Sequence, residues 1–160
     1  MTGPRPSRAR ATARLSDREM AAWQALLHAH DVLIRQLGAE LRERHGISLS
    51  DYDVLVRLAR VAEHRMPMSE LAQRAMFSPS GLTRVVDRLV DRGLVERTRD
   101  GADSRVIHAS LTAAGSTRVR QASRTHLDGI RRRFTSQLSD EQLDQVAGAL
   151  EMISGPHVPH

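Results

Sequence analysis

The chain has 160 residues, of which 40% are hydrophobic and 27% charged, so it is long enough for one globular protein that buries its own core. It has no cysteine, which excludes disulfides, thiolate metal sites and cysteine nucleophiles. Its net charge of +5 is a weak indication of DNA binding, because +4 of it comes from arginines that precede the first acidic residue: Arg5, Arg8, Arg10 and Arg14.

The first fifteen residues are predicted to form a disordered basic arm. Gly3, Pro4 and Pro6 lie there among the arginines, and large apolar side chains are almost absent. A solvated tail is the favoured interpretation of this arm, and contact with DNA is the alternative. The arm lacks the apolar stretch of a signal peptide, and no apolar run approaches the ~20 residues that a membrane span needs, so we expect a cytoplasmic protein.

A long helix is predicted next, from Ser16 to about Arg44. Ser16 and Glu19 have the spacing of a capping box, in which each side chain binds an otherwise unpaired amide of the first turn. Leucine and alanine then recur at three- and four-residue intervals until His45 and Gly46 end the helix.

The middle of the chain is predicted to hold three helices. The first follows Ser50 and is broken at Pro67; the second is short, covers residues 69–75 and has Ser69 at its N-cap. The third begins at Ser78, a good N-cap, and stops before Gly93. Its inward apolar stripe is Leu82, Val85, Val86 and Leu89, and its exposed polar side is Ser80, Thr83, Arg84, Asp87 and Arg88.

A basic β-hairpin is predicted directly after this third helix, with strands at 94–99 and 106–111. Two short helices, the second with exposed small polar and arginine side chains, followed by a basic hairpin are typical of a winged helix-turn-helix. The major groove of DNA admits one helix, and arginines of a hairpin can bind phosphate or enter the minor groove. We therefore predict a mainly α fold with a small β-hairpin wing that binds DNA.

Two further helices are predicted after Thr112. The first follows the helical period, and the second starts with another capping box, Ser139 and Gln142, and continues to Ile153. A flexible tail, residues 155–160, ends the chain.

Four motifs between residues 68 and 115 are specific in combination: MSELA, SPSGLTR, DRGLV, and DSR followed by LTAAG. Together they resemble the multiple antibiotic resistance regulator (MarR) family of bacterial repressors, and with the flanking helices the resemblance extends over residues 16–153. Ala109, where the family usually has valine, is a small departure that concerns the packing of the wing.

The resemblance implies a homodimeric transcriptional repressor of its own and neighbouring genes, which places two recognition helices in successive major grooves of a pseudo-palindromic operator. It also implies that Asp103 helps to hold the wing arginine, Arg105. We expect residues 48–112 to bind DNA and residues 16–47 and 113–154 to form the dimer. The predicted DNA-binding residues are Ser69, Ser78, Ser80, Gly81, Thr83, Arg84, Arg88, Arg97, Arg99, Asp103 and Arg105.

Apolar side chains on the outer helices agree with a dimer, because they offer more apolar surface than one small wing domain covers. The predicted interface residues are Leu26, Leu127, Ile130, Phe134, Leu143, Val146, Leu150 and Ile153.

Members of the family often bind a small aromatic or phenolic ligand in a cleft between the dimerisation helices and the wing domain, and the ligand then disfavours DNA binding. For an aromatic or organic-acid ligand, the predicted contacts are Arg18, Trp23, His28, His30 and Tyr52. Arg18 would meet an anionic group. Packing in the dimer interface is the favoured interpretation of Trp23.

The alternatives are an enzyme, a metal-responsive regulator and a non-specific architectural DNA-binding protein. The sequence has no phosphate-binding glycine loop, metalloprotease helix or nucleophile elbow, so we predict neither catalysis nor a cofactor. His28 and His30 lie on nearly opposite sides of a helix and cannot chelate one ion within a protomer, so a metal-responsive regulator would have to assemble its site across two chains. His157 and His160 could bind metal in the tail, but solvated surface histidines are the favoured interpretation. An architectural protein would bind operator and random DNA almost alike, whereas a regulator would discriminate by ~10³ or more.

Overall fold

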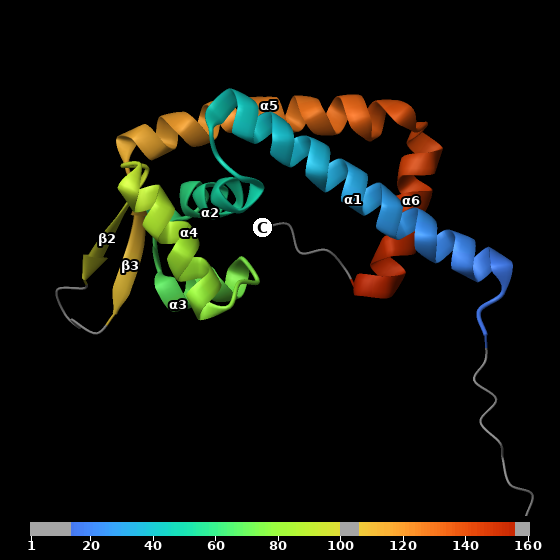
Figure 1. The fold of residues 1–160 in the computed structure, drawn as a ribbon, viewed down its shortest axis with the longest axis horizontal. Helices are drawn as coiled ribbons and strands as arrows, with labels where there is room; N and C mark the ends of the chain where they lie inside the picture. The colour runs from blue at the N-terminus through green and yellow to red at the C-terminus, as the bar shows by residue number, and fades with distance from the viewer. Residues whose placement is uncertain (1–13, 100–105, 156–160) are drawn as a thin grey trace, which may run out of the picture. The chain divides into compact units, whose positions relative to one another are not determined.

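The computed structural model describes residues 14–99 and 106–155 (Figure 1). The chain divides after residue 32 into two compact units, and the first helix, α1 (Asp17–His45), runs through that division. No helix in the described part of the chain is long and apolar enough to cross a bilayer.

The described part of the first unit is the beginning of α1. The amide of Ser16 donates to Glu19 Oε2 at 2.7 Å, and the amide of Glu19 donates to Ser16 Oγ at 3.3 Å, which confirms the predicted capping box. Residues 14–31 are all exposed within the single chain.

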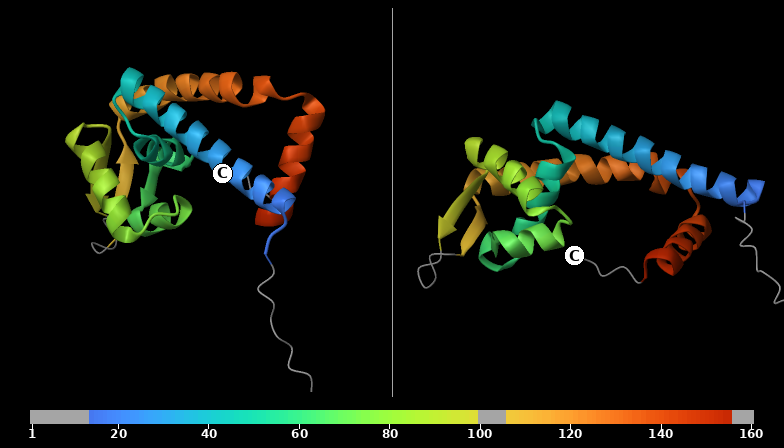
Figure 2. Two further views of the ribbon diagram at one scale, coloured as in Figure 1. Left: turned by 45° about the vertical axis from the view of Figure 1, so that its right-hand side comes forward. Right: turned by 60° about the horizontal axis from the view of Figure 1, so that its bottom comes forward.

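The second unit contains a helix-turn-helix followed by a hairpin. The helix pair is α3 (Met68–Arg74) and α4 (Pro79–Asp91), and the hairpin is β2 (Val95–Arg99) and β3 (Ile107–Leu111). In both views of Figure 2, α5 leads away from the end of β3. The remaining elements are α2 (Leu49–Ala59), the short 3-10 turns η1 (Ala62–His64) and η2 (Thr135–Gln137), β1 (Arg65–Pro67), α5 (Ala113–Arg133) and α6 (Asp140–Ser154). The predicted fold class, mainly α with a small wing, is confirmed.

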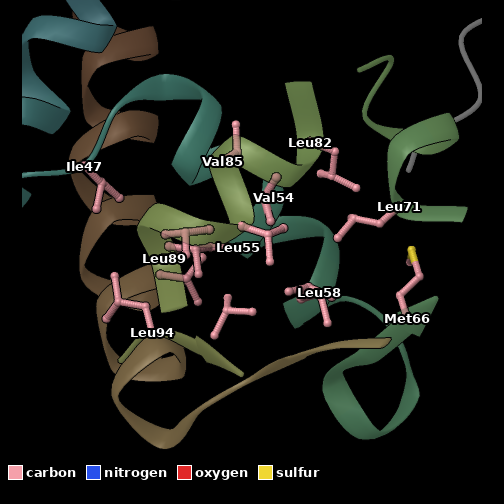
Figure 3. Close-up of a cluster of buried hydrophobic side chains, with 14 of the residues drawn as sticks. Ile47, Val54, Leu55, Leu58, Met66, Leu71, Leu82, Val85, Leu89 and Leu94 are labelled. Atoms are coloured by element: carbon pink, nitrogen blue, oxygen red, sulfur yellow. The ribbon is translucent and has the colours of Figure 1, made fainter. Parts of the chain in front are cut away.

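One apolar core positions α4 within the second unit (Figure 3). The predicted inward stripe of α4 is buried, and it packs against side chains of α2, α3 and the start of β2. Full burial of one Leu or Val side chain stabilises a fold by about 1.5–3 kcal/mol, so the stripe fixes which side of α4 faces solvent. The buried side chains are Leu82, Val85, Val86 and Leu89 on α4, with Val54, Leu55, Leu58, Leu71 and Val95 around them.

The sheet contains one strand, β1, that the sequence does not predict. β1 pairs antiparallel with β3, with Met66 opposite Ala109, and the strand order is β1-β3-β2. A three-residue segment is too short to show strand alternation, and proline is confined to strand ends and sheet edges. Pro67 is therefore the last residue of an edge strand, whereas the sequence predicted only the end of a helix there.

Two helices begin differently from the prediction. α2 starts before Ser50, because Ser48 and Asp51 form a capping box: the Ser48 amide donates to Asp51 Oδ2 at 2.9 Å, and the Asp51 amide donates to Ser48 Oγ at 3.1 Å. α3 starts directly after Pro67, which is its N-cap and makes no side-chain cap. The prediction of Ser69 as the N-cap is wrong, since that serine lies inside the first turn.

The last two helices begin as predicted. Thr112 Oγ1 accepts from the Gly115 amide at 3.0 Å, and Ser139 and Gln142 form the second capping box. Position 115 requires glycine, because a β-carbon there would overlap the carbonyl oxygen of Leu94. This close approach joins the start of α5 to the start of the wing.

Candidate nucleic-acid interface

The start of α4 is fixed by its first two residues. Ser78 Oγ accepts from the Gly81 amide at 3.1 Å, and Pro79, the first helical residue, has no amide to leave unpaired. Ser80 Oγ lies 3.4 Å from Ser78 Oγ. The free amides of a first helical turn carry a partial positive charge, so this end of α4 favours an anionic group such as phosphate.

The outward side of α4 presents Ser80, Thr83 and Arg84, all exposed. Thr83 Oγ1 donates to the Pro79 carbonyl at 2.8 Å, which leaves the oxygen of the hydroxyl free to accept. The side chain of Arg84 makes no hydrogen bond or ion pair within residues 14–99 and 106–155. Its backbone carbonyl accepts from Arg88 Nη1 at 3.3 Å. Its guanidinium is therefore available to a partner outside this part of the chain.

Arg88, also predicted to face DNA, forms an ion pair within the protein. Its Nη2 donates to Asp51 Oδ1 at 2.9 Å. Asp51 is 4% exposed, whereas the Arg88 side chain is 51% exposed. The pair fastens α4 to the first turn of α2, while half of the Arg88 side chain still faces solvent.

A second ion pair fastens α4 to the wing. Arg97 Nη1 on β2 donates to Asp87 Oδ1 at 2.5 Å, and Arg97 Nη2 donates to the Thr83 carbonyl at 3.4 Å. The carboxylate of Asp87 thus offsets the charge of Arg97, so fewer donors of this arginine remain for a ligand than the sequence suggested. Arg99 is exposed at the end of β2, opposite Ile107 in the register.

Two predicted wing residues, Asp103 and Arg105, lie outside the described residues. Ser69 is exposed on α3 and lines one surface hollow with Pro79, so it lies beside the start of α4. The described part of the structure therefore places the predicted DNA-binding residues of α3 and β2 next to those of α4.

Sequence reasoning missed Asp51 and Arg92. The spacing of Ser48 and Asp51 is a capping signal that was available, but the pairing of Asp51 with Arg88 depends on residues 37 positions apart. Arg92 Nη1 donates to the Gly46 carbonyl at 2.7 Å, across 46 positions, and no local pattern signals it.

The predicted ligand contacts are divided between the two units. Arg18, Trp23, His28 and His30 are exposed on the first half of α1. Tyr52 lies in the second unit, where its hydroxyl donates to Ser123 Oγ at 3.2 Å. A site shared by all five residues stays a prediction.

Tyr52 borders a cavity of about 420 Å³ between α2 and α5. Val56, Val119 and Leu127 give it apolar walls, and three arginines line it as well: Arg60, Arg120 and Arg124. The ring of His126 lies next to the Tyr52 ring, at 4.7 Å between the ring centroids. Burial lowers the pKa of His126, because it disfavours the charged imidazolium.

No group of three His, Asp or Glu side chains with metal-binding geometry occurs among the described residues.

The predicted interface residues are only partly covered in the single chain. Leu127, Leu150 and Ile153 are exposed, and Ile130, Phe134, Leu143 and Val146 are half-buried. Leu26 is also exposed. Met152, which the sequence analysis did not select, is 84% exposed beside Ile153 on α6, where no residue is buried. An apolar surface of this kind on α6 is one that soluble proteins usually cover.

Comparison with known proteins points to one family. A sequence model of the MarR family matches residues 45–106. MdtR, an HTH-type transcriptional repressor from Bacillus subtilis, is 30% identical over 132 residues, which cover 82% of this chain and 83% of the relative. The crystal structure of AbsC, a MarR family transcriptional regulator from Streptomyces coelicolor, is similar with a TM-score of 0.83 and 34% identity, over 89% of this chain and 96% of AbsC. Sco3205, a MarR family regulator from the same organism solved in complex with DNA, has a TM-score of 0.84 and 28% identity, over 92% of each chain.

Proposed function

Because the chain belongs to the MarR family, we propose that it is a sequence-specific DNA-binding regulator that acts as a homodimer and represses its own and neighbouring genes. The observation that carries the proposal is the outward side of α4, where the guanidinium of Arg84 is unpaired within the described residues while its neighbours Arg88 and Arg97 are held by carboxylates. The major groove of DNA admits one α-helix, whose exposed polar side can reach the base edges. α4 has such a side, and its buried apolar stripe faces the protein core.

The roles within the interface follow from this division. Ser80, Thr83 and Arg84 would read base edges, since they are exposed and arginine binds guanine with two parallel hydrogen bonds. The first-turn amides behind Ser78, together with Ser69, would bind phosphate. Arg88 and Arg97 would mainly hold α4 in place and bind phosphate with the donors that remain.

A dimer is proposed because of the apolar side chains that one chain leaves exposed. Leu127, Leu150 and Ile153 are each more than two-fifths exposed, and α6 buries no residue by itself. A two-fold dimer would present two copies of α4 about 34–36 Å apart, which corresponds to one helical turn of DNA. Residues 16–47 and 113–154 would supply this interface, and residues 48–112 the DNA-binding domain.

Release by a small molecule is the proposed mode of regulation. The cavity between α2 and α5 supports it, because apolar walls together with lining arginines suit an aromatic ring that carries an anionic group. A ligand there would touch α5 and α2 together, and it would shift the protein only if its affinity differed between the DNA-binding and the free conformation.

The test uses the full chain in three steps. Its operator is selected from a random duplex library, its mass in solution is measured by sedimentation, and its affinity for the selected duplex is measured by titration. At fixed salt, we expect a dimer that binds the selected duplex ~10³-fold or more tightly than unrelated duplex. A monomer, or equal affinity for both duplexes with a steep salt dependence, would favour the architectural protein instead.

A further inference from the structure

The C-terminal end of α1 is bound by arginines of two other elements. Carbonyls at a helix end have no partner within the helix. Here the carbonyl of His45 accepts from Arg118 Nη1 of α5, and the carbonyl of Gly46 accepts from Arg92 Nη1 at 2.7 Å. The partial negative charge of a helix C-terminus favours both arginines. Arg92 is the residue that ends α4, so this contact joins the ends of α1 and α4 directly.

Backbone hydrogen bonds and a glycine turn shape the two sides of the contact. After Arg92, the Gly93 amide donates to the Val90 carbonyl at 2.8 Å, and the Leu94 amide donates to the Leu89 carbonyl at 2.9 Å, which closes the end of α4. On the other side, Gly46 has a φ of +65°, a left-handed conformation that glycine adopts without strain.

The guanidinium of Arg92 also lies close over Gly46. A β-carbon built at position 46 would be 3.3 Å from Arg92 Nη2, which is tighter than ordinary contact. Even alanine at position 46 would therefore press against this guanidinium, and it would strain the backbone as well.

The contact lies at a point where small rotations have large effects. α4 has 13 residues, and at 1.5 Å per residue it is about 20 Å long. A tilt of about 10° at the Arg92 end would move the start of the helix by about 3 Å, close to the ~3.4 Å rise of one base pair.

We infer that Arg92 is a positioning residue, which sets the tilt of α4 relative to α1 and so the half-site separation that the dimer accepts. The inference rests on the proposed function, since it requires two copies of α4 on one operator. Arg92 acts through the Gly46 carbonyl in this role and needs no contact with DNA.

The experiment measures affinity against operator spacing. The full chain is titrated with a panel of DNA duplexes derived from the selected operator. In these duplexes the spacing between the two half-sites ranges from two base pairs shorter to two base pairs longer than in the operator. The readouts are the ratio of Kd values between the best spacing and its neighbours, and the slope of log Kd against log salt at the best spacing. The variants are Arg92→Ala, Gly46→Ala and the two together. The matched control is Arg74→Ala, which removes another exposed arginine, one that pairs with Glu70 on α3.

We expect Arg92→Ala to reduce the spacing ratio about fivefold, with the salt slope unchanged. Gly46→Ala should also reduce the spacing ratio, and the double variant should have a ratio no lower than that of Arg92→Ala alone. Arg74→Ala should keep the wild-type ratio. A uniform loss of affinity at every spacing, with a slope that falls by about 0.9, would identify Arg92 as a phosphate contact and overturn the inference. An unchanged spacing ratio in Arg92→Ala would overturn it too. A wild-type chain without any spacing preference would contradict the proposed function itself.

Discussion

Arg88 of helix α4 donates from Nη2 to Oδ1 of the buried Asp51 at 2.9 Å, and this pair fastens α4 to the first turn of α2. Asp51 also caps α2, so one carboxylate serves both the helix start and the position of α4. An arginine on the predicted DNA-facing side thus has a partner inside the protein before any DNA is bound.

This pair should contribute measurably to stability. A double-mutant cycle with Asp51→Asn and Arg88→Gln, followed by urea unfolding, should give a coupling free energy of about 1 kcal/mol, because Asp51 is buried although Arg88 is half exposed. The matched control is the pair of Arg131 and Asp128 on α5, both more than half exposed, which should couple by less than about 0.5 kcal/mol. Equal coupling in the two cycles would mean that the buried pair has no special role.

Arg84→Ala should weaken operator binding and relax the base preference at one position of each half-site. A bidentate contact between arginine and guanine contributes about 1–3 kcal/mol of discrimination, so we expect a loss of about tenfold or more at matched salt. Gel-shift titrations with the selected operator and with single-base variants measure both effects. Arg74→Ala on α3 is the control and should bind as the wild type does; an Arg84→Ala variant that also binds as the wild type would remove Arg84 from the interface.

The ion pairs of Glu40 should make stability depend on pH. Glu40 accepts from Arg133 Nη2 at 2.7 Å and from Arg132 Nη2 at 2.9 Å, and these arginines, Arg133 foremost, lower the pKa of Glu40. A lowered folded-state pKa adds stability above the ordinary glutamate pKa of about 4.3, and this stability is lost as the pH falls through the folded-state pKa.

The variant Glu40→Gln tests the sign of this effect. At pH 7 its free energy of unfolding should be lower than that of the wild type by about 1 kcal/mol, and the difference should close as the pH falls below about 4. Urea titrations at several pH values measure the difference. A gap of constant size across the acidic range would show that the charge of Glu40 is not its source.

Met76, in the turn between α3 and α4, should be replaceable with a gain in stability. It is 89% exposed and has a φ of +53°, in the left-handed region that costs a non-glycine residue about 1–2 kcal/mol. Met76→Gly should raise the free energy of unfolding by about 0.5–1 kcal/mol. The relief of backbone strain exceeds this value, but glycine also gives the unfolded chain more conformational entropy, which offsets part of the relief. The control, Gln73→Gly within α3, should lower it by about 1 kcal/mol; a loss of stability in both variants would show that the turn is not strained.

The sequence predicted those features that depend on neighbouring residues. The apolar stripe of α4 and the caps at Ser16, Ser78 and Ser139 are confirmed, because helix periodicity and capping act within one or two turns. The strand β1 was not predicted, because its three residues become a strand only by pairing with β3.

The candidate interface follows the same division. Sequence alone placed Arg84, Arg88 and Arg97 on the correct elements, but it treated them as equivalent donors. The structure separates them, because the carboxylates that hold Arg88 and Arg97 come from Asp51 and Asp87, which reach them only in the folded chain. Local spacing does not reveal such long-range pairs, and for the same reason Arg92 was missed.

The most direct measurement is methylation protection of guanine N7, a major-groove atom, in the selected operator with the full chain bound. We predict two protected clusters, symmetric about the operator centre and one helical turn, about 10 base pairs, apart. Arg84→Ala should remove protection at the same base in both clusters. A single cluster, or protection that does not change with Arg84, would contradict the placement of α4 in two successive major grooves.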